Sequence, residues 1–393
     1  MQGLMKLEER AGHTAIPFAM HDAKNDGTPW SRYFVSPLDT SRPHWGLGAL
    51  SQAKRALWST EAKTKMGRLI DDFRPDVVHA HNLYTHLSPS PLAACKERGV
   101  PVVMTVNDYG IVSANYGLWG NGRPVDPQRA GILSTTRSRF IKHSAVASFT
   151  LASLFAFQRL WKMYESYVDV FVPCSQFVRD ALITVGYPAD RIVVQHLFAE
   201  PFMVDEAYPA ERKKKFVLFA GRLEDYKGVQ TLIEAGRALP DVEIRIVGTG
   251  PQEAMFRKMA GSAANIRFVG FVPGRQLWGM MREAVAVVVP SIWYEPFGLV
   301  AVEAMAQSTP VIVSDRGGLP EIVQDGVSGL VFKGGDAKDL RKKIELLLGD
   351  AKKCQTMGKA ARERAWAISN PQEHLAKIID LYIKVQAGPN IHR

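Results

Sequence analysis

The sequence predicts an α/β protein built from two doubly wound domains of parallel sheet. Short runs of β-branched residues alternate with amphipathic segments along the whole chain. Continuously apolar strands separated by helices of this length are typical of parallel sheets that are covered on both faces. The length of 393 residues, with 46% hydrophobic and 22% charged residues, suits two or three globular domains at about 150 residues each. This composition excludes the disordered and fibrous classes.

The second half of the sequence shows the alternation most regularly. Amphipathic segments over 229–239, 251–260 and 299–307 predict helices. The strands expected between and around them cover residues 216–221, 243–248, 266–272, 284–290, 310–315 and 329–332.

The first half repeats the pattern less regularly. Its expected strands cover residues 15–19, 76–80, 101–106, 168–173 and 191–196. The boundary should lie between Phe198 and Phe216, where prolines and a basic run replace the periodic pattern. We therefore expect an N-terminal domain over 1–205 and a C-terminal domain over 206–370.

A last helix is expected over 371–385, within a terminal segment of residues 371–393. Its apolar residues fall on one helical face, which should dock on another part of the protein. They are Leu375, Ile378, Ile379, Tyr382 and Ile383.

The charge and the cysteine content limit the classes of partner and the cellular compartment that we expect. The formal charge of +10 is shared about equally by the two halves, unlike the basic tail of a nucleic-acid-binding protein. It suits an anionic small molecule or a negatively charged membrane face. Three isolated cysteines favour neither a disulfide framework nor a zinc site, so we expect a reducing, cytoplasmic compartment. The longest apolar stretch, 144–158, is shorter than the ~20 residues of a membrane-spanning helix.

The most informative motif is E-P-F-G-L-V-A-V-E at residues 295–303. A helix should begin near Gly298, which leaves Glu295 on the preceding loop and Glu303 about 7 Å along the axis at ~1.5 Å per residue. The first amides of this helix, at 297–299, would point outward at the positive end of the helix dipole and could hold a phosphate. The flanking carboxylates would then accept hydrogen bonds from hydroxyls, which is the layout of a nucleotide sugar. The alternative is a pair of ordinary surface glutamates.

A second motif lies where the first strand of the second domain ends. It reads G-R-L-E-D-Y-K-G at residues 221–228. Ligands bind at the carboxyl edge of open parallel sheets, and Arg222 and Lys227 are suited to a diphosphate as a bidentate fork and a point charge. The alternative is two solvated surface cations.

Together these motifs resemble family 4 of the retaining glycosyltransferases. The second half carries G-R-x-x-x-x-K-G, V-G-x-G-P, G-F-V, E-P-F-G-L-V-x-x-E-A-M-A and G-G-L-P-E in this order. The first half resembles a branch of the same family through G-H at 12–13, Y-F-V-S at 33–36, H-A-H-N at 79–82, L-S-P-S at 87–90 and P-C-S-Q-F at 173–177. The resemblance implies the GT-B fold, two Rossmann-like domains facing a cleft, with the last helix crossing back to the first domain.

The resemblance also implies the roles of individual residues. Arg222 and Lys227 would stabilise the leaving diphosphate in place of a metal ion, and no D-x-D triplet occurs in the chain. Glu295 would contact hydroxyls of the donor sugar, and Glu303 would contact the ribose. The amides of Phe297, Gly298 and Leu299 would hold phosphate or sugar oxygens.

The same resemblance places the base near 270–272, with Phe271 and Val272 as contacts, and Gly221 beside the donor. The donor would be a UDP- or GDP-sugar, with no metal and no further cofactor. The G-T-G at 248–250 is no dinucleotide fingerprint, because residue 253 is Glu253 rather than glycine.

Two departures from the family pattern bear on activity. Family members commonly have a histidine where this chain has Asn107, whose amide binds a hydroxyl but takes no proton. His79 and His81 are either substitutes for that imidazole or ordinary structural histidines.

The second departure is at the amino terminus. Family chains begin with a strand, a glycine-rich loop and a helix that ends in Gly-His, whereas here Gly12 and His13 are reached at once. We expect the first strand, its loop and most of the helix to be absent, which would leave an open edge in the first sheet and a defective donor-facing wall.

Residues 137–162 have two interpretations. An apolar segment flanked by Arg137, Lys142, Arg159 and Lys162, with Trp161 at its end, fits a helix that lies in a membrane interface. It equally fits a helix pair packed inside the first domain. The membrane interpretation would suit a lipid-linked acceptor and a location at the inner face of the membrane.

Three functions remain open from the sequence. The first is a sugar transferase that uses a saccharide or lipid-linked acceptor in cell-surface polysaccharide or glycolipid synthesis. The second is another GT-B enzyme, such as an epimerase or a phosphorylase. The third is a catalytically impaired protein that binds nucleotide sugars. No nucleic-acid partner is expected.

Overall fold

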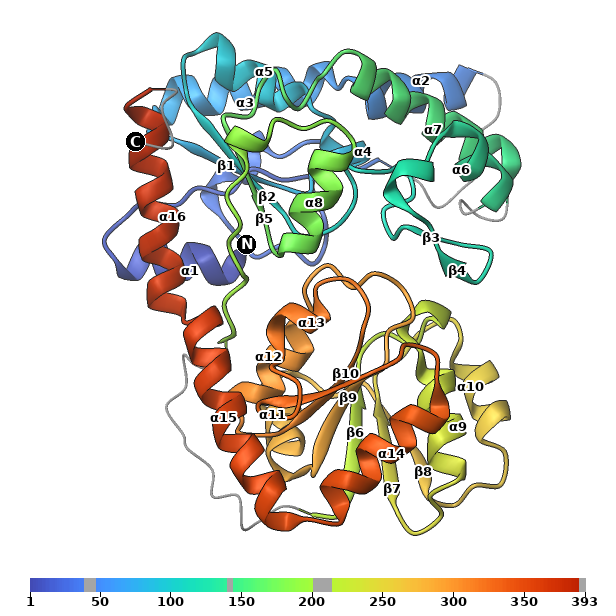
Figure 1. Ribbon diagram of the computed structural model, residues 1–393. Helices are drawn as coiled ribbons and strands as arrows, with labels where there is room; N and C mark the ends of the chain where they lie inside the picture. The colour runs from blue at the N-terminus through green and yellow to red at the C-terminus, as the bar shows by residue number, and fades with distance from the viewer. Residues whose placement is uncertain (39–46, 140–143, 201–213, 389–393) are drawn as a thin grey trace.

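The computed structural model of residues 1–393 has two α/β domains that face each other, joined along one side by two long helices, α15 and α16 (Figure 1). The structure describes residues 1–38, 47–139, 144–200 and 214–388. Most of the segment expected to link the domains, 201–213, lies outside this range. The predicted fold class is confirmed.

The second domain contains a six-stranded sheet in the order β11-β10-β9-β6-β7-β8, and all its strand pairs are parallel. All six strands expected from the sequence form. They are β6 (Phe216–Ala220), β7 (Glu243–Val247), β8 (Ile266–Gly270), β9 (Ala286–Val289), β10 (Val311–Ser314) and β11 (Gly329–Phe332).

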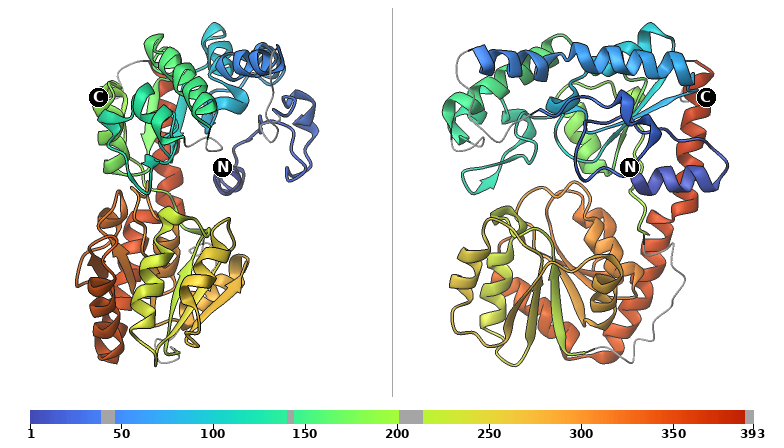
Figure 2. Two further views of the ribbon diagram at one scale, coloured as in Figure 1. Left: turned by 90° about the vertical axis from the view of Figure 1, so that its right-hand side faces the viewer. Right: turned by 180° about the vertical axis from the view of Figure 1, so that it is seen from behind.

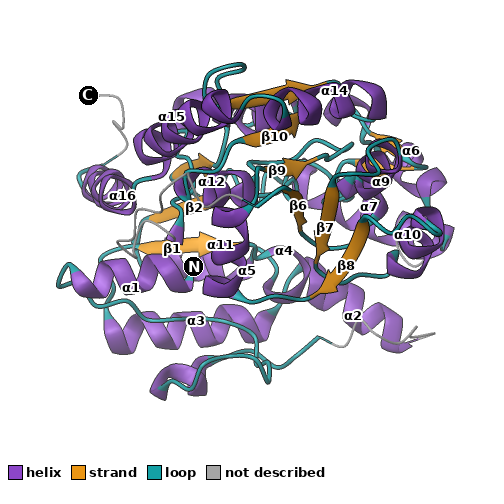
Figure 3. Cartoon of the chain, turned by 90° about the horizontal axis from the view of Figure 1, so that it is seen from below, coloured by secondary structure: helices purple, strands orange, loops and turns teal. Residues whose placement is uncertain are grey.

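Helices cover both faces of this sheet (Figure 3). Alternate residues of β6 supply the two cores, as the twofold period of a strand requires: Val217 and Phe219 pack into one cluster, and Phe216 and Leu218 into the other. The helices are α9 (Val229–Arg237), α10 (Glu253–Ala260), α11 (Gly274–Glu283), α12 (Leu299–Ala306), α13 (Leu319–Ile322), α14 (Ala337–Leu348) and α15 (Ala351–Ser369).

The first domain has a smaller parallel sheet, with β2 (Val102–Val106) between β1 (Val78–His81) and β5 (Val170–Pro173). Two predicted strands are wrong. The segment 15–19 does not form a strand, and a single isolated bridge joins the residue after it, Met20, to Val35. The segment 191–196 makes a single isolated bridge, between Ile192 and Phe171. Both segments have strand-like composition, but neither pairs over enough residues to form a ladder.

The helices of the first domain surround this sheet, and a short hairpin extends toward the second domain (Figure 1). The hairpin strands are β3 (Trp119–Gly120) and β4 (Arg123–Pro124). The helices are α1 (Gln2–Arg10), α2 (Leu47–Leu57), α3 (Thr60–Phe73), α4 (Tyr84–Leu87), α5 (Ser90–Glu97), α6 (Ile132–Ser138), α7 (Ala145–Leu160) and α8 (Gln176–Thr184). Short 3-10 turns lie at Pro29–Tyr33, Pro127–Arg129, Ala189–Arg191 and Asp225–Lys227.

One edge of the first sheet is open within the described residues. There β1 pairs with β2 alone. A cavity of about 840 Å³ lies beside β1 and is lined by residues of α1, α3 and α16, including Leu4, Met66 and Tyr382. The open parallel edge expected from the sequence is therefore present in this part of the chain.

The last helix, α16 (Pro371–Gln386), crosses back to the first domain as predicted. Asn370 ends the preceding helix and caps α16, because its side chain accepts hydrogen bonds from the amides of Gln372 and Glu373. The apolar face of α16 packs on β2 and β5 through Ile378 and Leu381. Seen from behind, α1 lies beside α16 at the margin of the first domain (Figure 2).

Gly228 fixes the entry to α9, and its replacement should be costly. It has φ +74°, and a Cβ atom there would lie 1.8 Å from the carbonyl oxygen of Pro290. We expect Gly228→Ala to lower the free energy of unfolding by about 2–4 kcal/mol, from backbone strain and overpacking. Gly279, inside α11 with no atom within 4 Å of an added Cβ, is the matched control. Gly279→Ala should leave stability unchanged or raise it by up to about 1 kcal/mol. Equal effects in urea unfolding would contradict this account.

Candidate functional site

The predicted site residues of the second domain gather where its sheet reverses direction. The chain runs from β6 outward to β7 and β8, and then returns to β9 on the other side of β6. Ligands of open α/β sheets bind in the crevice at this switch point, outside the carboxyl ends of the strands. Arg222 and Lys227 follow β6, and Glu295 and the start of α12 follow β9.

Arg222 extends from the end of β6 into solvent. Its side chain is 68% exposed, and its Nε lies 3.0 Å from Oε1 of Glu224. The preceding residue, Gly221, packs closely on the next strand: a Cβ at Gly248 would lie 1.9 Å from the Gly221 carbonyl oxygen. This close packing of the backbone fixes the position from which the exposed guanidinium projects.

Lys227 and Glu295 form the centre of a hydrogen-bonded group. Lys227 Nζ lies 3.0 and 2.9 Å from the two carboxylate oxygens of Glu295. Oε2 of Glu295 also accepts hydrogen bonds from Ser291 Oγ at 2.7 Å and from Trp293 Nε1 at 2.9 Å. The ammonium group lies 5.0 Å from the centroid of the Trp293 ring, a cation–π contact. These contacts fix both side chains, so the charge of Lys227 is preorganised.

Trp293 and Ser291 were not predicted from the sequence. Trp293 lies two residues before Glu295 on the same loop. An indole N–H this close in sequence to a predicted site carboxylate could have indicated a hydrogen bond between them. Ser291 offers no comparable signal, because a serine after a strand is common in turns.

The first turn of α12 has free amide donors. Gly298 is the N-cap residue at φ +102°, and a Cβ there would lie 2.5 Å from Cδ2 of Leu319. Ala301 N donates to Gly298 O. Among the described residues no acceptor is found for the amides of Phe297, Gly298 or Leu299. The predicted cluster of unpaired donors at the positive end of the helix dipole is present.

Glu303 lies one turn into α12, partly buried. Burial raises its pKa to about 7, and the nearby carboxylate of Glu200 adds to the shift. Within the described residues Glu303 makes no hydrogen bond or ion pair. An unpaired, partly buried carboxyl group is able to accept hydroxyl donors.

The residues expected near the base lie at the end of β8. Phe271 is 75% exposed, and Val272 packs at the margin of the core. An exposed aromatic ring at the carboxyl edge of the sheet offers a surface for stacking.

Asn107 ends β2 in the first domain, and its Oδ1 is buried with no hydrogen-bond partner. Two residues later, the Tyr109 ring lies 6.4 Å from that of Trp293, so the end of β2 approaches the Lys227–Glu295 group. The hydroxyl of Tyr109 is also buried without a partner. Buried polar atoms are rarely left unpaired, which distinguishes these two atoms from most of their buried neighbours.

His79 and His81 both lie within β1, which extends one residue beyond the expected strand 76–80. His79 contacts Tyr382 OH at 2.6 Å and Thr105 Oγ1 at 2.7 Å through its two ring nitrogens, and His81 stacks on it. Burial lowers the pKa of His79 and lowers that of His81 to about 3. His79 is therefore a structural histidine with both nitrogens paired, and neither ring carries a charge near pH 7.

Two further contacts join the domains at the site. Trp119 of the β3–β4 hairpin donates through Nε1 to Asp225 at 3.1 Å, two residues before Lys227. Glu321 of the second domain accepts hydrogen bonds from the amides of Gln176 and Phe177, at 2.8 Å each. Burial opposes a charge on Glu321, but the His196 ring, whose Nε2 lies 3.8 Å from Oε2, and the hydrogen bonds from these two amides outweigh it and lower the pKa of Glu321. Sequence reasoning included Glu321 in a motif but gave it no role.

Two facing doubly wound domains and a C-terminal helix that crosses back to the first domain define the GT-B fold of glycosyltransferases. The chain belongs to glycosyltransferase family 4. Residues 10–198 match Glycosyltransferase Family 4, and residues 204–364 match Glycosyl transferases group 1.

Similar proteins act on sugars. Glycogen synthase of Mycobacterium tuberculosis is 29% identical over 331 residues, covering 80% of this chain and 70% of the relative. D-inositol 3-phosphate glycosyltransferase of Corynebacterium glutamicum is 37% identical over 194 residues, 45% of each chain. Sucrose-phosphate synthase of Thermosynechococcus elongatus superposes with a TM-score of 0.69 at 21% identity, covering 98% of this chain and 92% of that one. HepE of Anabaena, solved with UDP-glucose, gives 0.60 at 20% identity, covering 81% and 80%. Nucleotide-sugar transfer is therefore the class of activity.

Proposed function

We propose that this protein is a retaining, metal-independent hexosyltransferase that moves a sugar from a UDP- or GDP-sugar to a saccharide or lipid-linked acceptor. The observation that carries the proposal is that Arg222 and Lys227 follow β6 while the free amides of α12 follow β9, the two neighbouring strands at the switch point. Similar structures were solved with UDP, with UDP-glucose, or with UDP together with Fondaparinux and α-GlcNAc-glycerol. These support a nucleotide-sugar donor.

The proposed chemistry relies on charge stabilisation. As the bond between the sugar and the diphosphate breaks, negative charge develops on the leaving phosphate. Lys227, held by Glu295, and the exposed Arg222 stabilise that charge without reorganising. The carboxylate of Glu295 is hydrogen-bonded to Lys227, Ser291 and Trp293. Its main role is therefore to orient Lys227, and contact with the donor sugar is secondary.

Retention of configuration requires the acceptor hydroxyl to attack the sugar from the face that the diphosphate leaves. The group that takes the acceptor proton must then lie on that face. Asn107 has no basic atom, and burial keeps the pKa of His81 near 3. We therefore assign the acceptor proton to the leaving phosphate oxygen, which departs from the same face of the sugar that the acceptor hydroxyl attacks. Asn107 Oδ1, buried and unpaired, orients a sugar hydroxyl.

A second candidate is a protein that binds nucleotide sugars but does not turn them over. Asn107, at the position where the resemblance implies a histidine, favours it. Both candidates use the same donor site, so binding alone does not separate them.

We infer a role in cell-surface polysaccharide or glycolipid synthesis, at the cytoplasmic face of the membrane. The formal charge of +10 supports contact with an anionic surface. No helix in the described ranges is long and apolar enough to cross a bilayer.

A panel of nucleotide sugars tests the proposal. Thermal unfolding is measured with UDP-glucose, UDP-galactose, GDP-mannose and free UDP and GDP. A true donor at 100 times its Kd should stabilise the protein by about 2.7 kcal/mol. The stabilising donor is then supplied with saccharide acceptors, and the product anomer is assigned by NMR. We expect an α-linked product from an α-linked donor. A β-linked product would refute retention, and binding without turnover would favour the second candidate.

A further inference from the structure

One face of α7 carries exposed apolar side chains at both of its ends, with the polar Thr150 and Ser153 between them. Val146, Phe149, Leu160 and Trp161 are 74%, 53%, 76% and 56% exposed. Their spacing of three, eleven and one residues places them on one side of a helix with 3.6 residues per turn. Phe157 lies on the same side and stacks on Trp161 with ring centroids 3.8 Å apart. We call these five residues the α7 stripe.

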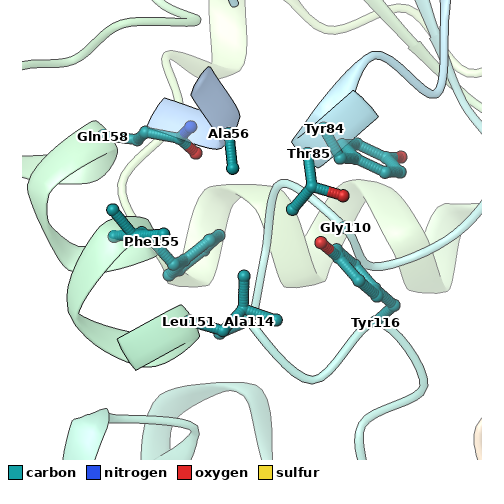
Figure 4. A pocket seen from close by; sticks show the side chains of 10 residues that line it. Ala56, Tyr84, Thr85, Gly110, Ala114, Tyr116, Leu151, Phe155 and Gln158 are labelled. Carbon is teal, nitrogen blue, oxygen red and sulfur yellow. The ribbon is translucent and has the colours of Figure 1, made fainter. Parts of the chain in front are cut away.

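The opposite face of α7 is already occupied. Leu151, Phe155 and Gln158 point toward Tyr84 and Tyr116 around a small pocket (Figure 4). This inner face attaches α7 to the first domain, so the α7 stripe is not needed for packing. In the described part of the chain, Ile132 and Leu133 of α6 extend the exposed apolar surface, at 36% and 73% exposure.

The chain segment that carries the α7 stripe is basic. No aspartate or glutamate occurs from residue 127 to 164, whereas this stretch contains six lysines and arginines. Arg137, Arg139 and Lys162 are exposed, and none of the three forms an ion pair within the described residues. Lys142 lies outside the described residues.

We propose that the α7 stripe, with Arg137, Arg139 and Lys162, docks on an anionic lipid bilayer. The inference deepens the proposed function, because it rests on a transferase that takes lipid-linked acceptors. Apolar side chains enter the interface while the adjacent cations pair with lipid phosphates, the arrangement of an interfacial amphipathic helix. A second copy of the chain is the poorer occupant, because it would bring like charges together.

Vesicle co-sedimentation tests this surface. The full chain is mixed with vesicles of equal parts phosphatidylcholine and phosphatidylglycerol, and with vesicles of phosphatidylcholine alone. We expect binding to the anionic vesicles, with partitioning at least about tenfold weaker to the neutral ones. The double variant Phe149→Ser with Trp161→Ser should lose about tenfold or more in partitioning, and so should Arg137→Gln with Arg139→Gln and Lys162→Gln.

The control variant is Val327→Ser with Leu346→Ser, which removes exposed apolar residues of the second domain, 54% and 42% exposed. It should bind vesicles like the unchanged chain. Equal binding by the double variant, or no binding by the unchanged chain, overturns the proposal. A lipid-free dimer that the double variant abolishes also overturns it, in favour of self-association.

Donor turnover with a soluble acceptor is measured on the same variants. We expect it to stay within about twofold of the unchanged chain, because the α7 stripe is remote from Lys227. Vesicle binding without any turnover would refute the proposed function and leave the docking surface standing. Turnover without vesicle binding would support the proposed function and refute the docking surface.

Discussion

Replacing Lys227 with methionine is expected to lower kcat for sugar transfer by about 10²–10³-fold. Lys227 Nζ is held by both oxygens of Glu295 and lies beside the Trp293 ring, so its charge is in place before the donor arrives. Methionine keeps the length and apolar stem of the side chain but removes the charge. Initial rates at saturating donor measure the loss, and KM for the donor should rise by a smaller factor.

Lys214 provides the matched control. It lies at the amino end of β6, at the opposite end of the strand from Lys227, and it pairs with Glu283 at 2.8 Å. Lys214→Met should keep kcat within about twofold, since surface ion pairs contribute little. If Lys214→Met and Lys227→Met lose activity equally, or if Lys227→Met keeps full activity, the placement of the diphosphate is wrong.

Replacing Glu303 with glutamine is expected to weaken donor binding by about 10–100-fold. Hydrogen bonds to a charged group contribute roughly 1.5–3 kcal/mol, and Glu303 has no partner of its own among the described residues. Titration calorimetry with UDP or GDP gives the Kd. Glu345, a carboxylate on α14 paired with Arg341, is the control, and Glu345→Gln should leave the Kd unchanged.

The raised pKa of Glu303 has a separate consequence for stability without ligand. Its folded pKa of about 7 lies above the ordinary 4.5, so between these values the folded chain binds more protons than the unfolded one. The free energy of unfolding therefore falls as pH rises through this window, by up to roughly 3 kcal/mol. Glu303→Gln should remove this pH-dependent loss. The stability of the variant relative to the unchanged chain should therefore increase from pH 5 to pH 8. A constant difference in melting temperature across that range would contradict a buried, unpaired Glu303.

The second domain could be predicted well from its sequence, for physical reasons. Its inner strands β6, β9 and β10 are buried at every position and are flanked by helices, so each appears as a short apolar run. Its glycines mark backbone approaches that admit no Cβ, as at Gly228 and Gly298. The unpaired amides of α12 follow from Pro296 and Gly298, which prevent an earlier helix start.

The first domain was less predictable because its segments depend on neighbours distant in sequence. The runs at 15–19 and 191–196 have strand composition but too few pairing partners to form ladders. His79 falls in an expected strand, yet its environment is set by Tyr382 of the last helix, 303 positions away. The contact of Trp119 with Asp225 joins residues 106 positions apart, and no local pattern indicates it.

The central claim is that a diphosphate binds between Arg222, Lys227 and the first amides of α12. A crystal structure of the full chain with UDP or GDP tests it most directly. We predict density for both phosphates within hydrogen-bonding distance of Lys227 Nζ and the Gly298–Leu299 amides, with the ribose hydroxyls on Glu303. A nucleotide bound elsewhere, for example in the cavity along β1, would contradict the claim.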